Sequence, residues 1–146
     1  MLFLLINMPV TGISLKTIDA EKKKSTIPHG VSVNNKANTV EIKESDLPGI
    51  GQKGLIIDFI FETKYTTGEN ESIADIKIEG NVFYIGDDIK EIMNHWKKKK
   101  EIPEDAYVDI INTIFRKCVS KAMVLAEDLQ LPPPVGLPFA QKKGKE

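Results

Sequence analysis

Two alternating segments in the middle of the chain constrain its fold most strongly. Residues 55–66, LIIDFIFETKYT, carry apolar side chains at nearly every second position, with polar residues between them. Residues 73–85, IADIKIEGNVFYI, repeat this pattern after a polar turn, TGENES. Such alternation indicates strands with one buried and one solvated face, and the short connection makes them antiparallel. The sequence therefore predicts a β-hairpin, with Gly80 marking a candidate β-bulge.

The chain before this hairpin adds shorter strand candidates. They are bounded by residues typical of turns and alternate loosely between apolar and polar side chains. Residues 45–54, SDLPGIGQKG, are rich in turn residues and predict a connecting loop that carries Leu47 and Ile50. The three strand candidates are residues 13–20, 27–35 and 39–44.

The hydrophobic period changes from two to the helical period after the hairpin. Residues 87–100 place Trp96 on an apolar stripe and end in four lysines, which suit a helix C-terminus. A second helix is expected from Pro103 to about residue 130, a length of roughly 40 Å at 1.5 Å per residue. Its apolar stripe is wider than packing on one sheet face requires, which favours burial against another subunit.

The order of these segments predicts an α+β fold, with a four-stranded antiparallel sheet followed by two helices packed on one face. The 146 residues, 41% of them hydrophobic, suffice for one domain with a real core. We expect that domain to span residues 1–139, followed by a short charged tail at 140–146. The first ten residues, MLFLLINMPV, are compatible with an edge strand or with translation starting at Met8, and membrane insertion is not expected.

The sequence contains no signature of catalysis or of cofactor binding. It has no phosphate-binding glycine loop, no HExxH and no paired CxxC, so we expect no enzyme activity, no catalytic residue, no metal site and no cofactor. His29 and His95 lie far apart in the sequence and are interpreted as a turn residue and a helix residue. Cys118 is the only cysteine and is expected to be a buried small hydrophobe, which fits a reducing cytoplasm.

The run from Lys97 to Lys100 is the strongest charge feature. A solvated helix end explains it, and a partner surface for acidic protein or for RNA is the alternative. Arg116 is the only arginine, and lysine lacks the planar fork that favours base recognition. The basic partner surface would consist of Lys97, Lys98, Lys99 and Lys100.

The layout of the chain resembles that of the SecB family of export chaperones. In that family a strand, a crossover loop and two long antiparallel strands precede a helix, a connection and a long second helix. Residues 39–85 follow this order. Residues 115–139, FRKCVSKAMVLAEDLQLPPPVGLPF, resemble the family's later region, in which a helix leads into a segment containing proline and leucine and ending near a phenylalanine. The resemblance covers roughly residues 13–139.

The resemblance implies an ATP-independent holdase that binds unfolded or nascent polypeptides along apolar grooves, as a homo-dimer or homo-tetramer. Residues 131–139, LPPPVGLPF, form a stiff apolar arm that cannot continue the helix and would show its side chains to a client, a sister subunit or its own sheet. The client-binding residues expected from the loop, the first helix and this arm are Leu47, Ile50, Trp96, Leu131, Val135, Leu137 and Phe139.

The chain departs from the SecB pattern in its charges. In the family an acidic outer sheet face and a C-terminal extension contact the SecA motor. Here Lys64 and Lys77 interrupt the acidic residues, and the tail QKKGKE is basic. A holdase that acts alone or with a toxin–antitoxin system therefore fits better than delivery to SecA. The alternative function is a ribosome- or RNA-associated factor that uses the same fold as an oligomeric scaffold.

Overall fold

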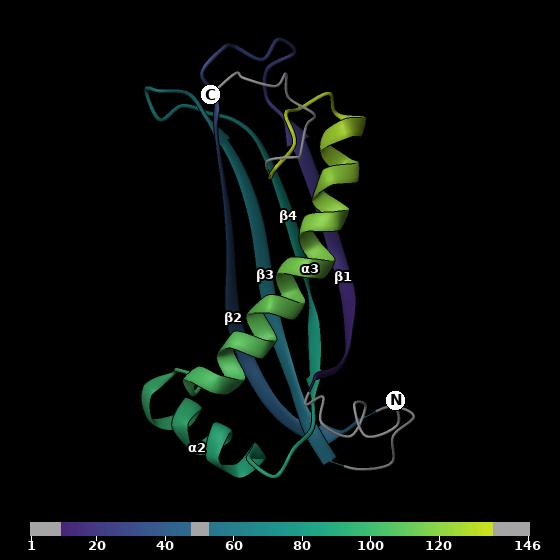
Figure 1. Cartoon of the computed structure of the whole chain (residues 1–146), viewed down its shortest axis with the longest axis vertical. Coiled ribbons are helices and arrows are strands. Elements are labelled where there is room, and N and C mark those ends of the chain that lie inside the picture. Colours follow the sequence, from purple (N-terminus) through teal and green to yellow (C-terminus); the bar gives the residue numbers. More distant parts are fainter. Residues whose placement is uncertain (1–9, 48–52, 136–146) are drawn as a thin grey trace, which may run out of the picture.

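A computed structural model describes residues 10–47 and 53–135 as a four-stranded antiparallel sheet with two helices (Figure 1). The strands are ordered β1-β4-β3-β2 across the sheet, so that the central hairpin is flanked by the two earlier strands. This architecture confirms the predicted α+β fold. The elements are β1 (Val10–Lys22), β2 (Ser32–Asp46), β3 (Lys53–Thr66), β4 (Ser72–Tyr84), α2 (Ile89–Lys99) and α3 (Glu104–Asp128).

The hairpin of β3 and β4 forms as its alternation predicts. The six inward side chains of β3 from Leu55 to Tyr65 are at most 1% exposed. A short turn closes the hairpin, with Asn70 in the left-handed region at φ 63° and its N–H donating to the carbonyl of Thr67 at 2.9 Å. Asparagine tolerates this conformation better than most residues, so the polar turn sequence sets the register of the core strands.

The two edge strands are longer and less regular than the sequence suggested. The candidates at 27–35 and 39–44 are wrong as separate strands, because β2 runs continuously from Ser32 to Asp46. Its register shifts between Thr39 and Glu41, which leaves Val40 as the extra residue. This extra residue reverses the inward and outward parity within β2, so simple alternation splits the strand in two.

A second bulge lies beside Gly80, as the sequence predicted, but the extra residue belongs to the neighbouring strand β1. The register of β1 against β4 shifts between Leu15 and Thr17, so Lys16 is the extra residue while Gly80 keeps its regular pairing with Phe59. A Cβ atom at Gly80 would clash with the backbone oxygen of Ser14. Glycine at this position therefore permits the close approach of the bulged strand.

α3 crosses one face of the sheet obliquely and contacts all four strands; we call this the inner face (Figure 1). Phe115 packs edge-to-face against Phe61, with 5.8 Å between ring centroids. α2 contacts β2 and contributes Ile92 and Trp96 to the same core. Residues at every fourth position of α3 face the sheet and are buried: Ala106, Ile110, Ile114, Cys118, Ala122 and Ala126.

The small side chains in this row allow the C-terminal half of α3 to lie close to the sheet. Cys118 is fully buried there, as the sequence indicated, and burial raises the pKa of its thiol to about 12. The thiol is therefore protonated and shielded in the folded chain.

Candidate functional site

A row of polar side chains interrupts the apolar inner face where the proline arm crosses it. Asn35 of β2 and Thr63 of β3 are directly paired across the strands, and the Thr63 hydroxyl donates to Asn35 Oδ1 at 2.7 Å. Asn35 Nδ2 in turn donates to the carbonyl of Pro134 at 2.9 Å. The Tyr65 hydroxyl donates to the carbonyl of Pro132 at 2.6 Å. We call Asn35, Thr63 and Tyr65 the clasp.

The end of α3 sets the direction in which the chain leaves the helix, and this direction leads the arm to the clasp. Gln130 adopts a left-handed conformation at φ 57°, and the N–H of Leu131 donates to the carbonyl of Ala126 at 2.8 Å, which is the pattern of a Schellman motif. The Lys22 ammonium donates to the carbonyl of Leu129 at 3.0 Å. The last turn of α3 is therefore capped, and the chain enters the arm in one direction.

The described part of the arm, residues 131–135, packs against the chain's own sheet. Leu131 is 7% exposed and belongs to the main core, and Pro134 is buried. Val135 is 36% exposed, where the described segment ends. Leu137 and Phe139 lie outside the described residues, so their role in client binding stays a prediction.

Burial of Tyr65 keeps its hydroxyl in the donating form. The side chain is fully buried, and desolvation raises the pKa of its phenol to about 12. Thr63 is the one polar or charged residue among the buried side chains of the described residues. A buried hydroxyl costs stability unless it is hydrogen-bonded, and here the bond to Asn35 offsets that cost.

Of the expected client-binding residues on the first helix and the loop, Leu47 is 3% and Trp96 is 6% exposed. The Trp96 indole N–H donates to Glu41 Oε1 at 3.4 Å. That carboxylate also accepts the N–H of Ile42, and these two bonds, the backbone bond first, lower the pKa of Glu41. Both apolar side chains therefore serve the core of the isolated chain. Ile50 lies outside the described residues, and a client role for all three stays a prediction.

The four lysines expected to form a basic surface are all exposed at the end of α2. Lys100 ends the helix in a left-handed conformation at φ 56° and holds its ammonium 5.4 Å from the centroid of the Trp96 ring. A hollow of about 300 Å³ lies beside it, between β2 and the start of α3. It is lined by Thr39, Lys100, Glu101, Ile102 and Tyr107.

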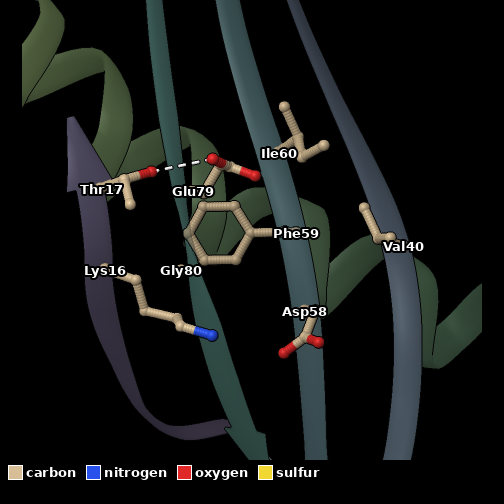
Figure 2. A pocket seen from close by; sticks show the side chains of 8 residues that line it. All are labelled: Lys16, Thr17, Val40, Asp58, Phe59, Ile60, Glu79 and Gly80. Carbon is tan, nitrogen blue, oxygen red and sulfur yellow. Dashed lines mark hydrogen bonds between the residues drawn. The ribbon is translucent and has the colours of Figure 1, made fainter. Parts of the chain in front are cut away.

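The outer face of the sheet, away from α3, carries a second hollow of about 220 Å³ (Figure 2). It lies between the two bulged edge strands, with Lys16 on one side and Val40 on the other. The Glu79 carboxylate accepts a hydrogen bond from Thr17 at 2.9 Å, and Asp58 accepts one from Asn81. Both carboxylates thus have protein donors, and the hollow has a mixed polar and apolar lining rather than a set of convergent reactive groups.

α3 and β1 also leave apolar side chains in contact with solvent. Tyr107, Val108 and Val124 of α3 are 41%, 48% and 55% exposed, and Ile18 of β1 is 45% exposed. Ile111 and Phe115 are half-buried on the same helix. These exposed side chains are spread along α3 and β1, and they are the apolar surface that the described residues offer to another polypeptide.

The clasp is the feature that the sequence interpretation missed. Thr63 has the same parity as the buried residues of its strand, so a polar residue among apolar inward positions was the available signal. Asn35 gave no such signal, because the sequence divided β2 into two candidate strands and so did not predict which face of the sheet Asn35 would occupy. The acceptors of the clasp are carbonyls of the proline arm, and no local pattern links residue 35 to residue 134.

Comparison with known proteins identifies the fold. The sequence matches no protein-family model and no curated protein. The structure is similar to the Mycobacterium tuberculosis SecB-like chaperone Rv1957, solved in complex with a ChAD peptide from the Rv1956 HigA1 antitoxin. The TM-score is 0.58 at 12% sequence identity, and the match covers 95% of this chain and 96% of the other.

The match spans almost the whole of both chains, and it includes the sheet and both helices. Neither helix of the described residues combines the length and the apolarity needed to cross a bilayer. The likeness agrees with the resemblance in segment order that the sequence shows. The chain has a SecB-like fold.

Proposed function

We propose that the chain is a SecB-like chaperone, an ATP-independent holdase that binds unfolded or nascent polypeptides in the cytoplasm. The observation that carries this proposal is the SecB-like fold over 95% of the chain, shared with a chaperone that was solved with a peptide. The exposed apolar side chains of α3 and β1 supply surface for such binding. Each client side chain that becomes fully buried contributes about 1.5–3 kcal/mol before the cost of ordering the client.

The same apolar surfaces support assembly into a homo-dimer or homo-tetramer. The half-buried residues of α3, such as Ile111 and Phe115, widen the apolar stripe beyond the row that faces the sheet. Covering part of this stripe with a second copy would leave the rest for clients. An antitoxin is one candidate client, because the M. tuberculosis neighbour was solved with an antitoxin peptide.

An aggregation assay tests the holdase proposal. A chemically denatured protein diluted into buffer should stay in solution when the chain is present in stoichiometric amounts without ATP, and the protection should persist at high salt because apolar burial drives it. Albumin at equal mass provides the control for crowding. Aggregation at the control rate would contradict the proposal.

A second candidate function is binding to RNA or ribosomes, which the four exposed lysines from Lys97 to Lys100 favour. Such binding should weaken steeply with salt, since each neutralised phosphate releases counterions. Replacing all four lysines by glutamine should abolish RNA binding and leave aggregation suppression unchanged if the holdase proposal is correct. RNA binding that is unaffected by this change would exclude the lysine run as the site.

A further inference from the structure

The proline arm is bound to the sheet as an extended peptide ligand would be. Residues 132–134 are three prolines, which have no backbone N–H, so the arm cannot add a strand to the sheet. It is held instead through two carbonyls, those of Pro132 and Pro134, and through the side chain of Leu131. The recognition pattern is an apolar anchor followed by acceptors one and three residues later.

The donors of the clasp are oriented by contacts within the sheet as well as by the arm. The Thr63 hydroxyl donates to Asn35 Oδ1, and this bond leaves Asn35 Nδ2 directed at the arm. Tyr65 is fully buried, and its hydroxyl donates to the carbonyl of Pro132. Simple coverage of the sheet by the arm would need only apolar side chains here, which carry no desolvation cost. Oriented donors are needed where a peptide backbone must be recognised.

The arm is attached by few interactions compared with the strands beneath it. Its described residues, 131–135, make no backbone ladder with the sheet, and Val135 at their end is 36% exposed. Its release would expose the donors of Asn35 and Tyr65 together with the apolar site of Leu131. A client with the same pattern could then take the place of the arm.

We propose that the clasp is a binding site for extended peptides with an apolar residue followed by N–H-poor backbone, and that residues 131–135 occupy this site in cis until a client displaces them. The proposal rests on the proposed chaperone function and adds the site, the class of peptide and an autoinhibitory contact. A tethered segment has an effective concentration of roughly millimolar, so a client must either exceed that concentration or bind additional surface, such as the apolar side of α3.

A buried thiol in the arm reports displacement in the full-length chain. Leu131→Cys places a thiol at a position that is 7% exposed, and Pro134→Cys provides a second buried reporter in case the first variant folds poorly. Val135→Cys, at 36% exposure, is the matched control. Cys118 is fully buried and serves as the internal reference. Alkylation by iodoacetamide is followed by mass spectrometry, and circular dichroism confirms folding.

Two probes are added, a synthetic peptide of residues 129–135 and a reduced, carboxymethylated protein that stays unfolded. Binding of each is measured separately by fluorescence anisotropy. We expect the alkylation rate at position 131 to rise at least fivefold as either probe saturates, with less than a twofold change in the Val135→Cys control. Tyr65→Phe removes the same bond from the tethered arm and from the added peptide, so this change should raise the alkylation rate at position 131 severalfold even without a probe.

The outcomes separate this inference from the proposed function. Binding of the unfolded protein without any change of alkylation at positions 131 and 134 would overturn the inference and leave the chaperone function in place. Displacement by the arm peptide with no binding of the unfolded protein would support the clasp as a peptide site and overturn the chaperone function. Binding of neither probe would overturn both.

Discussion

Removing one oxygen atom from the clasp tests how the arm is held. Tyr65→Phe keeps the buried ring and deletes the hydroxyl that donates to the Pro132 carbonyl at 2.6 Å. A typical intramolecular hydrogen bond contributes about 0.5–1.5 kcal/mol net, and leaving a buried partner unsatisfied adds to the loss. Pro132 is half-buried and its bond to Tyr65 is only partly shielded from solvent, which reduces that addition. We therefore expect a loss of about 1 kcal/mol in the free energy of unfolding.

Urea denaturation followed by circular dichroism measures this loss directly. A change of about 1 kcal/mol should lower the melting temperature by about 3 °C for a chain of this size. Tyr107→Phe is the matched control, because Tyr107 is 41% exposed and its hydroxyl is not needed to hold the arm. Equal unfolding midpoints for Tyr65→Phe, Tyr107→Phe and the parent chain would refute the idea that the clasp secures the arm.

Three further changes test the core and the surface. Gly80→Ala should cost about 2 kcal/mol by forcing β1 away from β4, measured by urea denaturation, whereas Gly68→Ala, whose Cβ would meet nothing within 4 Å, should change stability little. Burial raises the pKa of Cys118 from 9.0 and of Tyr65 from 10.0, each to about 12. Because the folded chain holds these two protons more tightly than the unfolded chain, their contribution to the free energy of unfolding is complete below pH 9 and is lost as the pH rises toward 12. Urea midpoints that stay constant from pH 9 to pH 12 would contradict this expectation. Light scattering should give a mass that is a multiple of 16.3 kDa, and Val124→Glu, at a 55% exposed site, should lower that mass if α3 forms the subunit contact; a parent chain that is monomeric at micromolar concentration would exclude the assembly.

The parts of the fold that follow from local patterns were predictable from the sequence. The alternation in residues 55–85 predicts both core strands and their buried faces, and the change of the hydrophobic period after them predicts both helices. The extent of β2 was not predictable in this way, because the extra residue Val40 reverses the parity and the preceding NNKAN stretch is polar. The strand accommodates these residues because Asn34, Lys36 and Asn38 are exposed, whereas Asn35 is hydrogen-bonded to Thr63 and to Pro134.

The candidate site was less accessible than the fold. The proline arm itself was visible in the sequence, because three prolines followed by apolar residues need cover. Where the arm docks depends on the left-handed turn at Gln130 and on the oblique path of α3, which are properties of the folded chain. Pairing of Asn35 with Pro134 spans 99 residues of sequence, so only the three-dimensional structure reveals it.

The β-bulges at Lys16 and Val40 lie at the same level of the sheet, one in each edge strand, since Leu15 pairs with Gly80, Thr39 pairs with Phe59, and Phe59 pairs with Gly80. Each long edge is thereby divided into two short runs of regular backbone. A foreign strand approaching either edge could pair in register with only one of these runs, because the bulge interrupts the ladder. A chain that exposes two long edges is thus protected from edge-to-edge pairing of its sheets into fibres. This protection would hold even at the high local concentrations of unfolded polypeptide in which the proposed holdase would work.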